Sequence, residues 1–143
     1  AEMFEKVRSS MYGFCWDCRS RLDRTVERCP DHDLTNGSCS GCDQRYRTKI
    51  AASCPACGTS GRGPLVEYAI VSPGIAACFD ECGSGPTAVG PWAYRLAALD
   101  AVTEVVPDRS GPAALFEFDC GERACTAVVE SGSDGIDVGV DRE

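Results

Sequence analysis

The sequence predicts an α+β fold: a zinc-ribbon β-hairpin with two pairs of zinc knuckles, followed by a small antiparallel sheet with one helix. Two observations lead to this prediction. Seven of the eleven cysteines and the single histidine lie between residues 15 and 57. Beyond that region, short apolar segments alternate with turn residues, and only one segment has a clear helix start. We therefore divide the chain into an N-terminal helix and double zinc ribbon, residues 1–62, and an α+β regulatory or sensor domain, residues 63–143.

The first twelve residues are predicted to form a short amphipathic helix. Met3, Phe4, Val7 and Met11 recur at the spacing of one helix face. We expect this face to pack on the domain or on a partner.

Four short motifs with metal-ligand spacing follow, CWDC, CPDH, CSGC and CPAC. Two ligands separated by two residues can bind one face of a tetrahedral ion, so each motif supplies half of a zinc site. Four halves make two closed sites with no ligand left over. A disulfide framework is disfavoured, because the chain shows no signal peptide for an oxidising compartment. The eight predicted zinc ligands are Cys15, Cys18, Cys29, His32, Cys39, Cys42, Cys54 and Cys57.

Three arrangements are open for the pairing of these motifs. Sequential pairing joins the first motif to the second and the third to the fourth, whereas a cross-brace, as in RING domains, joins alternate motifs. Nested pairing places the outer motifs at the base of one hairpin and the inner motifs at its tip. We favour nesting, because the spacers Arg19–Arg28 and Asp43–Ser53 contain no Gly, Pro or Asn. The strong turn signal, Asn36-Gly37, lies at the centre of the region.

The nested arrangement also predicts a register for the two arms. With Cys18 level with Cys54, one side of the ribbon is mostly apolar and the other carries opposite charges in register. Zinc then clamps both ends of a ribbon too narrow to hold a core of its own. The predicted cross-strand pairs are Leu22–Ile50, Val26–Tyr46, Asp23–Lys49 and Glu27–Arg45.

One helix and several strands are predicted in the second part. Residues 58–64 are expected to form a turn-rich exit from the ribbon, and residues 65–71 and 92–98 are expected to be strands by residue type. Ser72-Pro73 has the form of a helix N-cap followed by proline at the first helical position, and Gly83 or Gly85 ends this helix. Further strands are expected at residues 102–106, 114–120, 124–130 and 136–141, the second and third of them as a hairpin.

Four cysteines lie beyond the knuckles, at Cys78, Cys82, Cys120 and Cys125. The first two are four residues apart, so a helix presents both on one face, and the other two flank the hairpin turn. Three interpretations stay open: small buried hydrophobic side chains, a third metal site, and a thiol-based sensor. The spacings are looser than those of a knuckle.

The composition is acidic: 14 Lys and Arg, of which only two are Lys, oppose 22 Asp and Glu, for a formal net charge of −8. This balance is typical of proteins kept soluble at high salt, and it disfavours general nucleic-acid binding. Residues 1–62 carry a formal surplus of two positive charges, which zinc-bound thiolates cancel. No apolar run is long enough to span a membrane. These properties favour a cytoplasmic, halophilic protein without membrane contact.

The order of these elements is similar to that of a known family. A C-x-x-C, two strands ending in CPACG, the segment GPLVEYAIVSPGIAACFDECG and a closing set of strands resemble the C-terminal domain of haloarchaeal winged-helix regulators of the ArsR type. The resemblance covers roughly residues 14–143 and is most specific at Cys54–Gly83. In that family the outer C-x-x-C pairs form one zinc ribbon, which implies the ligand set Cys15, Cys18, Cys54 and Cys57. The inner four ligands and the four later cysteines depart from the pattern, and the winged helix is not in this sequence.

The resemblance implies a zinc-binding domain of a transcriptional regulator that senses a ligand or mediates assembly. The alternative is a free-standing zinc-ribbon adaptor that binds proteins. The expected partners are a protein or a small effector, a second copy in a homodimer, and DNA only through a winged-helix region outside this chain. Enzyme activity is not expected, because the single histidine serves as a zinc ligand and sites closed by four ligands leave no open coordination position.

Overall fold

The computed structural model has an α+β fold, as predicted, with five helices and two antiparallel sheets in the part of the chain that it describes. The described residues are 2–29, 32, 45–107, 111–121, 123–132 and 135–142. The elements in chain order are α1 (Glu2–Met11), β1 (Asp23–Arg28), β2 (Thr48–Ser53), β3 (Ser60–Pro64), α2 (Val66–Val71), α3 (Pro73–Glu81), α4 (Pro86–Val89), α5 (Pro91–Asp100), β4 (Val102–Val105), β5 (Ala114–Asp119), β6 (Ala124–Gly132) and β7 (Gly135–Arg142).

The ribbon is a three-stranded antiparallel sheet in the order β1-β2-β3. β1 and β2 pair as the two arms of the predicted hairpin, but Val26 lies opposite Ile50 and Glu27 opposite Lys49. The predicted register is therefore wrong by four residues. An even shift leaves every side chain on its predicted face of the sheet. Glu27 forms its ion pair with Arg62 of the third strand, at 3.0 Å between Oε1 and Nη2.

The register differs because the first knuckle is a longer turn than its four-residue motif indicates. The Cys15 N–H donates to the Ser20 carbonyl at 2.7 Å, and the Leu22 N–H donates to the Gly13 carbonyl at 2.9 Å. The chain therefore returns past its own knuckle before β1 begins. β2, by contrast, runs directly into Cys54. The residue level with Cys54 is thus Leu22 rather than Cys18.

Around the exit from the ribbon, two segments have a secondary structure different from the one predicted. Residues 60–64, expected to be a turn-rich exit, form the strand β3, which pairs with β2 over Lys49–Ser53. Residues 66–71, expected to be a strand, form the helix α2. Five of the six α2 residues are buried. A helix buried on all sides shows no 3.6-residue period, and its β-branched composition then resembles that of a strand.

The helix α3 was predicted correctly, with Ser72 as N-cap and Pro73 at its first position. Residues 92–98, expected to be a strand, instead belong to α5, which begins at Pro91 after Gly90. Tyr94 and Ala98 are the buried positions of α5, and they are four residues apart, which is a helical spacing. The prediction of a strand relied on residue type and overlooked this spacing. Among its described residues, the second part therefore has four helices rather than the one predicted.

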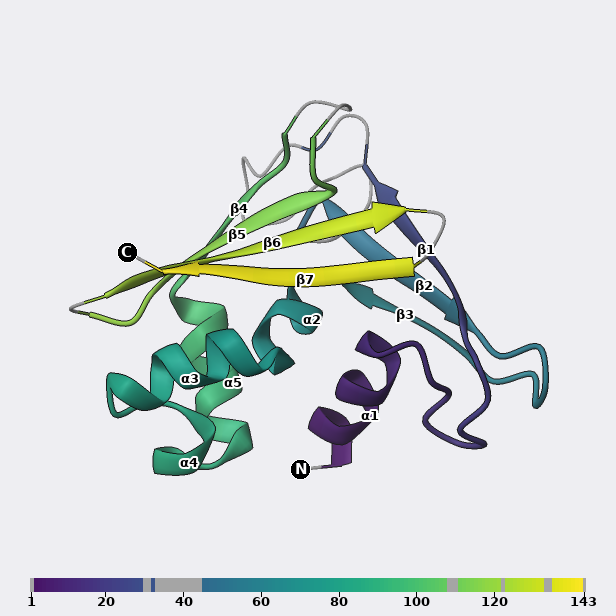
Figure 1. The fold of residues 1–143 in the computed structure, drawn as a ribbon, viewed down its shortest axis with the longest axis horizontal. Coiled ribbons are helices and arrows are strands. Elements are labelled where there is room, and N and C mark those ends of the chain that lie inside the picture. The colour runs from purple at the N-terminus through teal and green to yellow at the C-terminus, as the bar shows by residue number, and fades with distance from the viewer. Residues whose placement is uncertain are drawn as a thin grey trace.

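The predicted strands β4 to β7 all form, and they make a four-stranded antiparallel sheet in sequence order. β5 and β6 are the predicted hairpin, with Phe118 opposite Cys125. Figure 1 shows α2 to α5 on one side of this sheet and the ribbon strands beside it. None of the helices formed by the described residues has the length and hydrophobicity needed to cross a bilayer.

The main core lies between this sheet and the helices. Phe79 of α3 packs edge-on against Tyr94 and Phe118, with ring centroids 5.5 Å and 5.9 Å apart. Phe4 of α1 contacts the same Tyr94 ring at 6.3 Å, and the Tyr94 hydroxyl donates to the Ile70 carbonyl. The core thus includes residues from both sides of the predicted domain boundary at residue 62. That boundary stays a prediction.

Two polar contacts join the ribbon to the four-stranded sheet. The Glu104 carboxylate of β4 accepts hydrogen bonds from the N–H groups of Arg47 and Thr48, at 2.7 Å and 3.1 Å, and from the Thr48 hydroxyl at 2.5 Å. The ribbon also donates at a second place, where the Arg28 guanidinium of β1 donates to three carbonyls, those of Pro107, Pro112 and Ala113. We call these contacts the Glu104 and Arg28 clamps.

Candidate metal centre

The outer knuckles bring four cysteines together at one end of the ribbon. Their sulfur atoms all lie within 4.8 Å of one another, and this is the one such group of metal-ligating side chains among the residues that the structure describes. The Sγ atoms of Cys15 and Cys57 are 3.7 Å apart, and those of Cys18 and Cys54 are 3.4 Å apart. A tetrahedral ion with metal–sulfur bonds of about 2.3 Å requires sulfurs about 3.8 Å apart. The cluster therefore has the dimensions of a closed four-thiolate site.

The two knuckles have matching backbone turns. The N–H of Cys54 donates to the Thr59 carbonyl at 2.8 Å, as that of Cys15 does to Ser20. Four residues after the first cysteine of each knuckle, the chain adopts a left-handed conformation, at Arg19 with φ of 67° and at Gly58 with φ of 80°. Glycine adopts this conformation freely, whereas a residue with a Cβ is strained there. The repeated turn indicates that both knuckles are built to hold their sulfurs in the same way.

The site is half-buried. Cys15 and Cys54 are 0% and 2% exposed and pack with Leu22 and Ala52 in a small second core. Cys18 and Cys57 are exposed. One face of the cluster is thus fixed in the ribbon, while the other meets solvent.

Hydrogen bonds around the exposed sulfurs favour their thiolate forms. Hydrogen bonds from the Ser20 side chain and backbone lower the pKa of Cys18 to about 6. The side chain and backbone of Thr59 likewise lower the pKa of Cys57. The Cys57 backbone N–H donates toward Cys54 and lowers its pKa. Burial and the hydrogen bond to Cys18 together outweigh this effect and raise the pKa of Cys54 to about 11. A cation bound to the cluster would displace the thiol protons that remain.

The donor set determines what this site can do. Four thiolates are soft ligands, which suit zinc and exclude calcium or magnesium. A site closed by four protein ligands leaves no position for a substrate or an activated water. The arrangement is therefore that of a structural metal centre, as the outer half of the nested pairing predicts.

The inner predicted site lies partly outside the described residues. Cys39 and Cys42 are not among them, so the second zinc site stays a prediction. Cys29 lies just beyond the end of β1, where its carbonyl accepts a hydrogen bond from Arg47 Nε at 2.8 Å. The His32 Nε2 atom lies 2.9 Å from the Arg45 carbonyl. These contacts place two of the four inner ligands beside the second arm, as a hairpin tip requires.

The four later cysteines come together as two disulfides, Cys78–Cys125 and Cys82–Cys120. The prediction that Cys78 and Cys82 share one helix face is confirmed, because both form disulfides with cysteines of the β5–β6 hairpin. A sulfur in a disulfide is not a thiolate, so in this state the two pairs offer no metal ligands. The disulfides attach α3 to the sheet that it covers.

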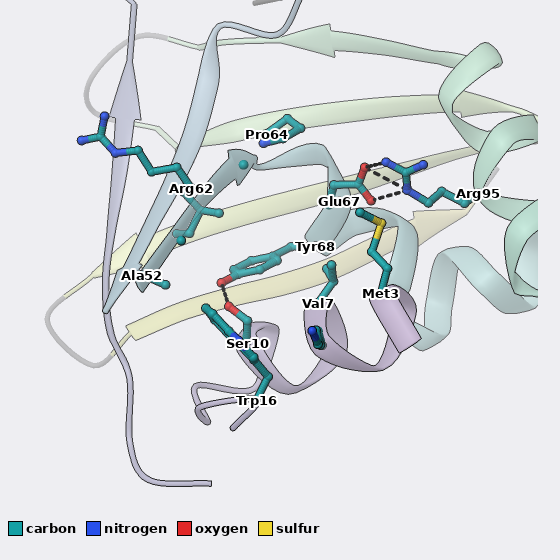
Figure 2. Close-up of a pocket in the computed structure, with 14 residues that line it drawn as sticks. Met3, Val7, Ser10, Trp16, Ala52, Arg62, Pro64, Glu67, Tyr68 and Arg95 are labelled. Atoms are coloured by element: carbon teal, nitrogen blue, oxygen red, sulfur yellow. Dashed lines mark hydrogen bonds and ion pairs between the residues drawn. The ribbon is translucent and has the colours of Figure 1, made fainter. Parts of the chain in front are cut away.

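Sequence reasoning did not find one further feature, a groove between α1, α2 and the ribbon. It is lined by Trp16 of the first knuckle and ends at an ion pair between Glu67 and Arg95 (Figure 2). The segments that carry Glu67 and Arg95 were both predicted as strands, and no sequence signal links residues 28 positions apart.

Comparisons with protein-family models, with curated proteins and with solved structures find no match for this chain.

Proposed function

We propose that this chain is a zinc-stabilised regulatory domain of a transcriptional regulator, which senses a small ligand or mediates assembly. The cluster of Cys15, Cys18, Cys54 and Cys57 carries the proposal, because its four sulfurs could hold a structural ion and would leave no coordination position for catalysis. The resemblance to the winged-helix regulators supports the regulatory role. In this proposal the protein acts in the cytoplasm and has no enzyme activity.

The ion stabilises the fold because the ribbon has little core of its own. Its small core contains four buried residues, two of which are the ligands Cys15 and Cys54. Metal-binding energy is then folding energy for this region. We expect at least one tightly bound zinc ion per chain by elemental analysis, and two if the inner site is complete. A chelator should unfold residues 14–58, and unchanged circular dichroism after verified zinc removal would contradict the structural role.

DNA contact is assigned to a winged-helix region outside this chain. The formal net charge is −8, so phosphate would repel most of the surface. We expect no appreciable binding of the 143 residues to labelled duplex DNA at about 0.15 M salt. Micromolar binding that is lost in R45A/R47A would show instead that the ribbon reads DNA.

The regulatory role is tested by tethering the chain to an unrelated DNA-binding domain at a reporter promoter. Transcription should change several-fold relative to that DNA-binding domain alone. The change should disappear in C15S/C57S, which cannot close the metal site. Equal transcription with and without the chain would contradict the regulatory role, whatever the zinc content.

An adaptor or assembly function is favoured by one observation. Val89, Trp92 and Leu96 are 45%, 62% and 49% exposed and lie on α4 and α5. These helices follow one another in the chain and pack together, and exposed large apolar side chains of this kind are common at sites of protein contact. If they form a homodimer contact, W92S/L96S should be monomeric by sedimentation at concentrations where the parent is a dimer. A monomeric parent would remove this support.

A further inference from the structure

The ribbon has a free edge at β3. Its sheet has the order β1-β2-β3, so within the part of the chain that the structure describes, β3 pairs with a strand on one side only. The first three residues of β3, residues 60–62, are exposed. The groove between the ribbon, α1 and α2 runs beside this edge as a cavity of about 420 Å³, lined in part by residues 61–64. An exposed strand edge is a template on which another extended chain can pair.

We propose that this edge and the groove together bind an extended peptide of a partner protein. The peptide adds to the ribbon as a fourth, antiparallel strand next to β3 and turns every second side chain, an apolar one, into the groove. The inference rests on the assembly form of the proposed function, to which it gives a site and a class of partner.

The hydrogen bonds of the ribbon determine which backbone groups of β3 face away from β2. The Cys54 N–H donates to the carbonyl of Thr59, just before β3, at 2.8 Å, so the backbone groups of Thr59 face β2. Every second residue of an antiparallel strand bonds to the same neighbour. Gly61 and Gly63 therefore bond to β2 too, and the backbone groups of the residues between them point the other way.

The outward-facing backbone groups are those of Ser60 and Arg62. Each residue offers one N–H donor and one C=O acceptor at the free edge, and an antiparallel strand uses both groups of each such residue. Pro64, the next outward residue, has no N–H, so the ladder ends there. The edge thus presents a short, defined set of hydrogen-bonding groups to a few residues of an extended peptide.

The glycines of β3 set the side-chain preference of the peptide. A Cβ added at Gly61 would lie 3.4 Å from the Trp16 ring, and one added at Gly63 would meet nothing within 4 Å. Side chains of directly opposed residues lie on the same face of a sheet. Peptide residues opposite these glycines therefore extend over the groove, whose lining includes Trp16 and Val7. Apolar side chains fit there.

The polar side chains of the groove already have partners. The Tyr68 and Ser10 hydroxyls are 2.5 Å apart, and Arg95 binds Glu67 with two nitrogens, with Nε 3.0 Å from Oε2. Lys6, which also lines the groove, is not free either. A charged or polar side chain placed in the groove would lose hydration without gaining a new partner. The groove therefore favours apolar side chains.

The side chain of Arg62 leaves the edge uncovered. It forms an ion pair with Glu27 of β1, at 3.0 Å between Nη2 and Oε1, and Figure 2 shows it turned away from Tyr68 and Ser10. A charged side chain that bent over the edge would hinder pairing. Here the charge is directed toward the ribbon instead.

The position of α1 favours a single peptide over a second copy of the chain. α1 lines the groove through Met3 and Val7, which lie on the helix side of it in Figure 2. An added strand requires about 4.8 Å next to β3. A second copy paired through its own β3 would bring a second α1 to the same edge, because such a contact is self-complementary. An extended peptide carries no helix with it.

Binding is tested with a fluorescein-labelled heptapeptide, KTITVTK, in which isoleucine and valine alternate with threonine. Its threonines are the residues that oppose the outward backbone groups, so their N–H groups face β3 in the antiparallel pairing. Two control peptides have the same sequence. One is N-methylated at the two threonines that flank the valine, which removes donors that face β3. The other is N-methylated at the isoleucine and the valine, whose N–H groups face away from β3.

Two substitutions test the site on the protein, each with a matched control. R62P removes the outward N–H, which a strand edge tolerates because that group has no partner in β2. R62A loses the same side chain and the same ion pair but keeps the N–H. G63L fills the groove, because Gly63 has no positive φ and an added Cβ there meets nothing within 4 Å. Gly139 on β7 has the same two properties, which makes G139L its control.

We expect a saturable rise in fluorescence anisotropy with KTITVTK, with a dissociation constant of about 1 mM or tighter. Methylation at the threonines should weaken binding at least about tenfold, and methylation at the isoleucine and valine should not. R62P should weaken binding about tenfold, because a peptide carbonyl loses its donor, and G63L by at least as much. R62A and G139L should bind like the parent. Hydrogen exchange of residues 60–64 should slow when the peptide is bound.

Circular dichroism and zinc content equal to those of the parent will confirm that R62P and G63L are folded. Four results would overturn the inference: no saturable binding of KTITVTK, methylated peptides that bind equally or in the opposite order, R62P that binds like R62A, or G63L that binds like G139L. If the parent is a dimer that R62P converts to a monomer, and the peptide does not bind, the edge belongs to a second copy instead. None of these results changes the zinc content or the reporter response, so the proposed regulatory role can fail or survive separately.

Discussion

The two disulfides that join α3 to the β5–β6 hairpin allow a quantitative prediction, because one is nested within the other. Cys78–Cys125 has a sequence separation of 47 and Cys82–Cys120 one of 38. In the chain-entropy model, either disulfide alone stabilises the fold by about 4 kcal/mol through restriction of the unfolded chain. Once one is formed, the other closes a ring of only about ten residues and adds about 3 kcal/mol.

We therefore expect C82A/C120A to lower the free energy of unfolding by about 3 kcal/mol, and loss of both disulfides to lower it by about 7 kcal/mol. The double loss exceeds the sum of the separate losses, since each disulfide shortens the loop that the other closes. Urea unfolding at saturating zinc, followed by circular dichroism without reductant, measures these values. The same comparison under reducing conditions isolates the effect of the side chains from that of the crosslinks.

Two results would refute this reasoning. The first is an equal free energy of unfolding for the parent and C82A/C120A without reductant. The second is alkylation of all four cysteines as free thiols in the purified parent, as measured by mass spectrometry. Either would show that the pairs stay reduced, and would return them to the metal-site or sensor interpretations.

Two other predictions concern the knuckle turns and the buried tyrosines. Arg19→Gly should raise the free energy of unfolding by up to about 1 kcal/mol by removing a left-handed residue with a Cβ, and Gly58→Ala should lower it by about 1 kcal/mol; urea midpoints in the opposite order would contradict this. Burial raises the pKa of three of the four tyrosines, so their contribution to stability is complete below about pH 10 and is lost as the pH rises toward the pKa of the folded state. The loss is up to about 1.4 kcal/mol per pH unit for each of the two fully buried tyrosines, and it is smaller for the partly buried one, which solvent screens. Absorbance at 295 nm should show them titrating together with alkaline unfolding, and early titration of all three in the folded state would refute it. These residues are Tyr46, Tyr68 and Tyr94.

The outer half of the metal centre could be predicted because its information is local. A pair of cysteines two residues apart fixes the geometry of half a site wherever the chain places it. The remaining step, which halves meet, followed from the turn signal between the spacers. The register of β1 against β2 was predicted wrongly, because it depends on the hydrogen bond from the Leu22 N–H to the Gly13 carbonyl. No residue type in the sequence indicates this longer turn.

The helices show where composition is a poor guide. α3 was predicted because Ser72-Pro73 is a local start signal. α2 was missed because burial on every side removes the amphipathic period. The groove was missed for the same reason, since Glu67 and Arg95 meet only when α2 and α5 are helices. The partners of Cys78 and Cys82 depend on how α3 lies across the sheet, which spacing does not specify.

The Glu104 and Arg28 clamps have a mechanical consequence. Six hydrogen bonds, all donated by the ribbon side and accepted by the side of the four-stranded sheet, join the two sheets at two places, so a tilt of the ribbon would break several of them together. The knuckle end and the exposed side chains of Trp92 and Leu96 therefore keep a constant separation. A partner that contacts both places would therefore need two contact sites at this fixed spacing. A molecule with differently spaced sites could contact only one of them.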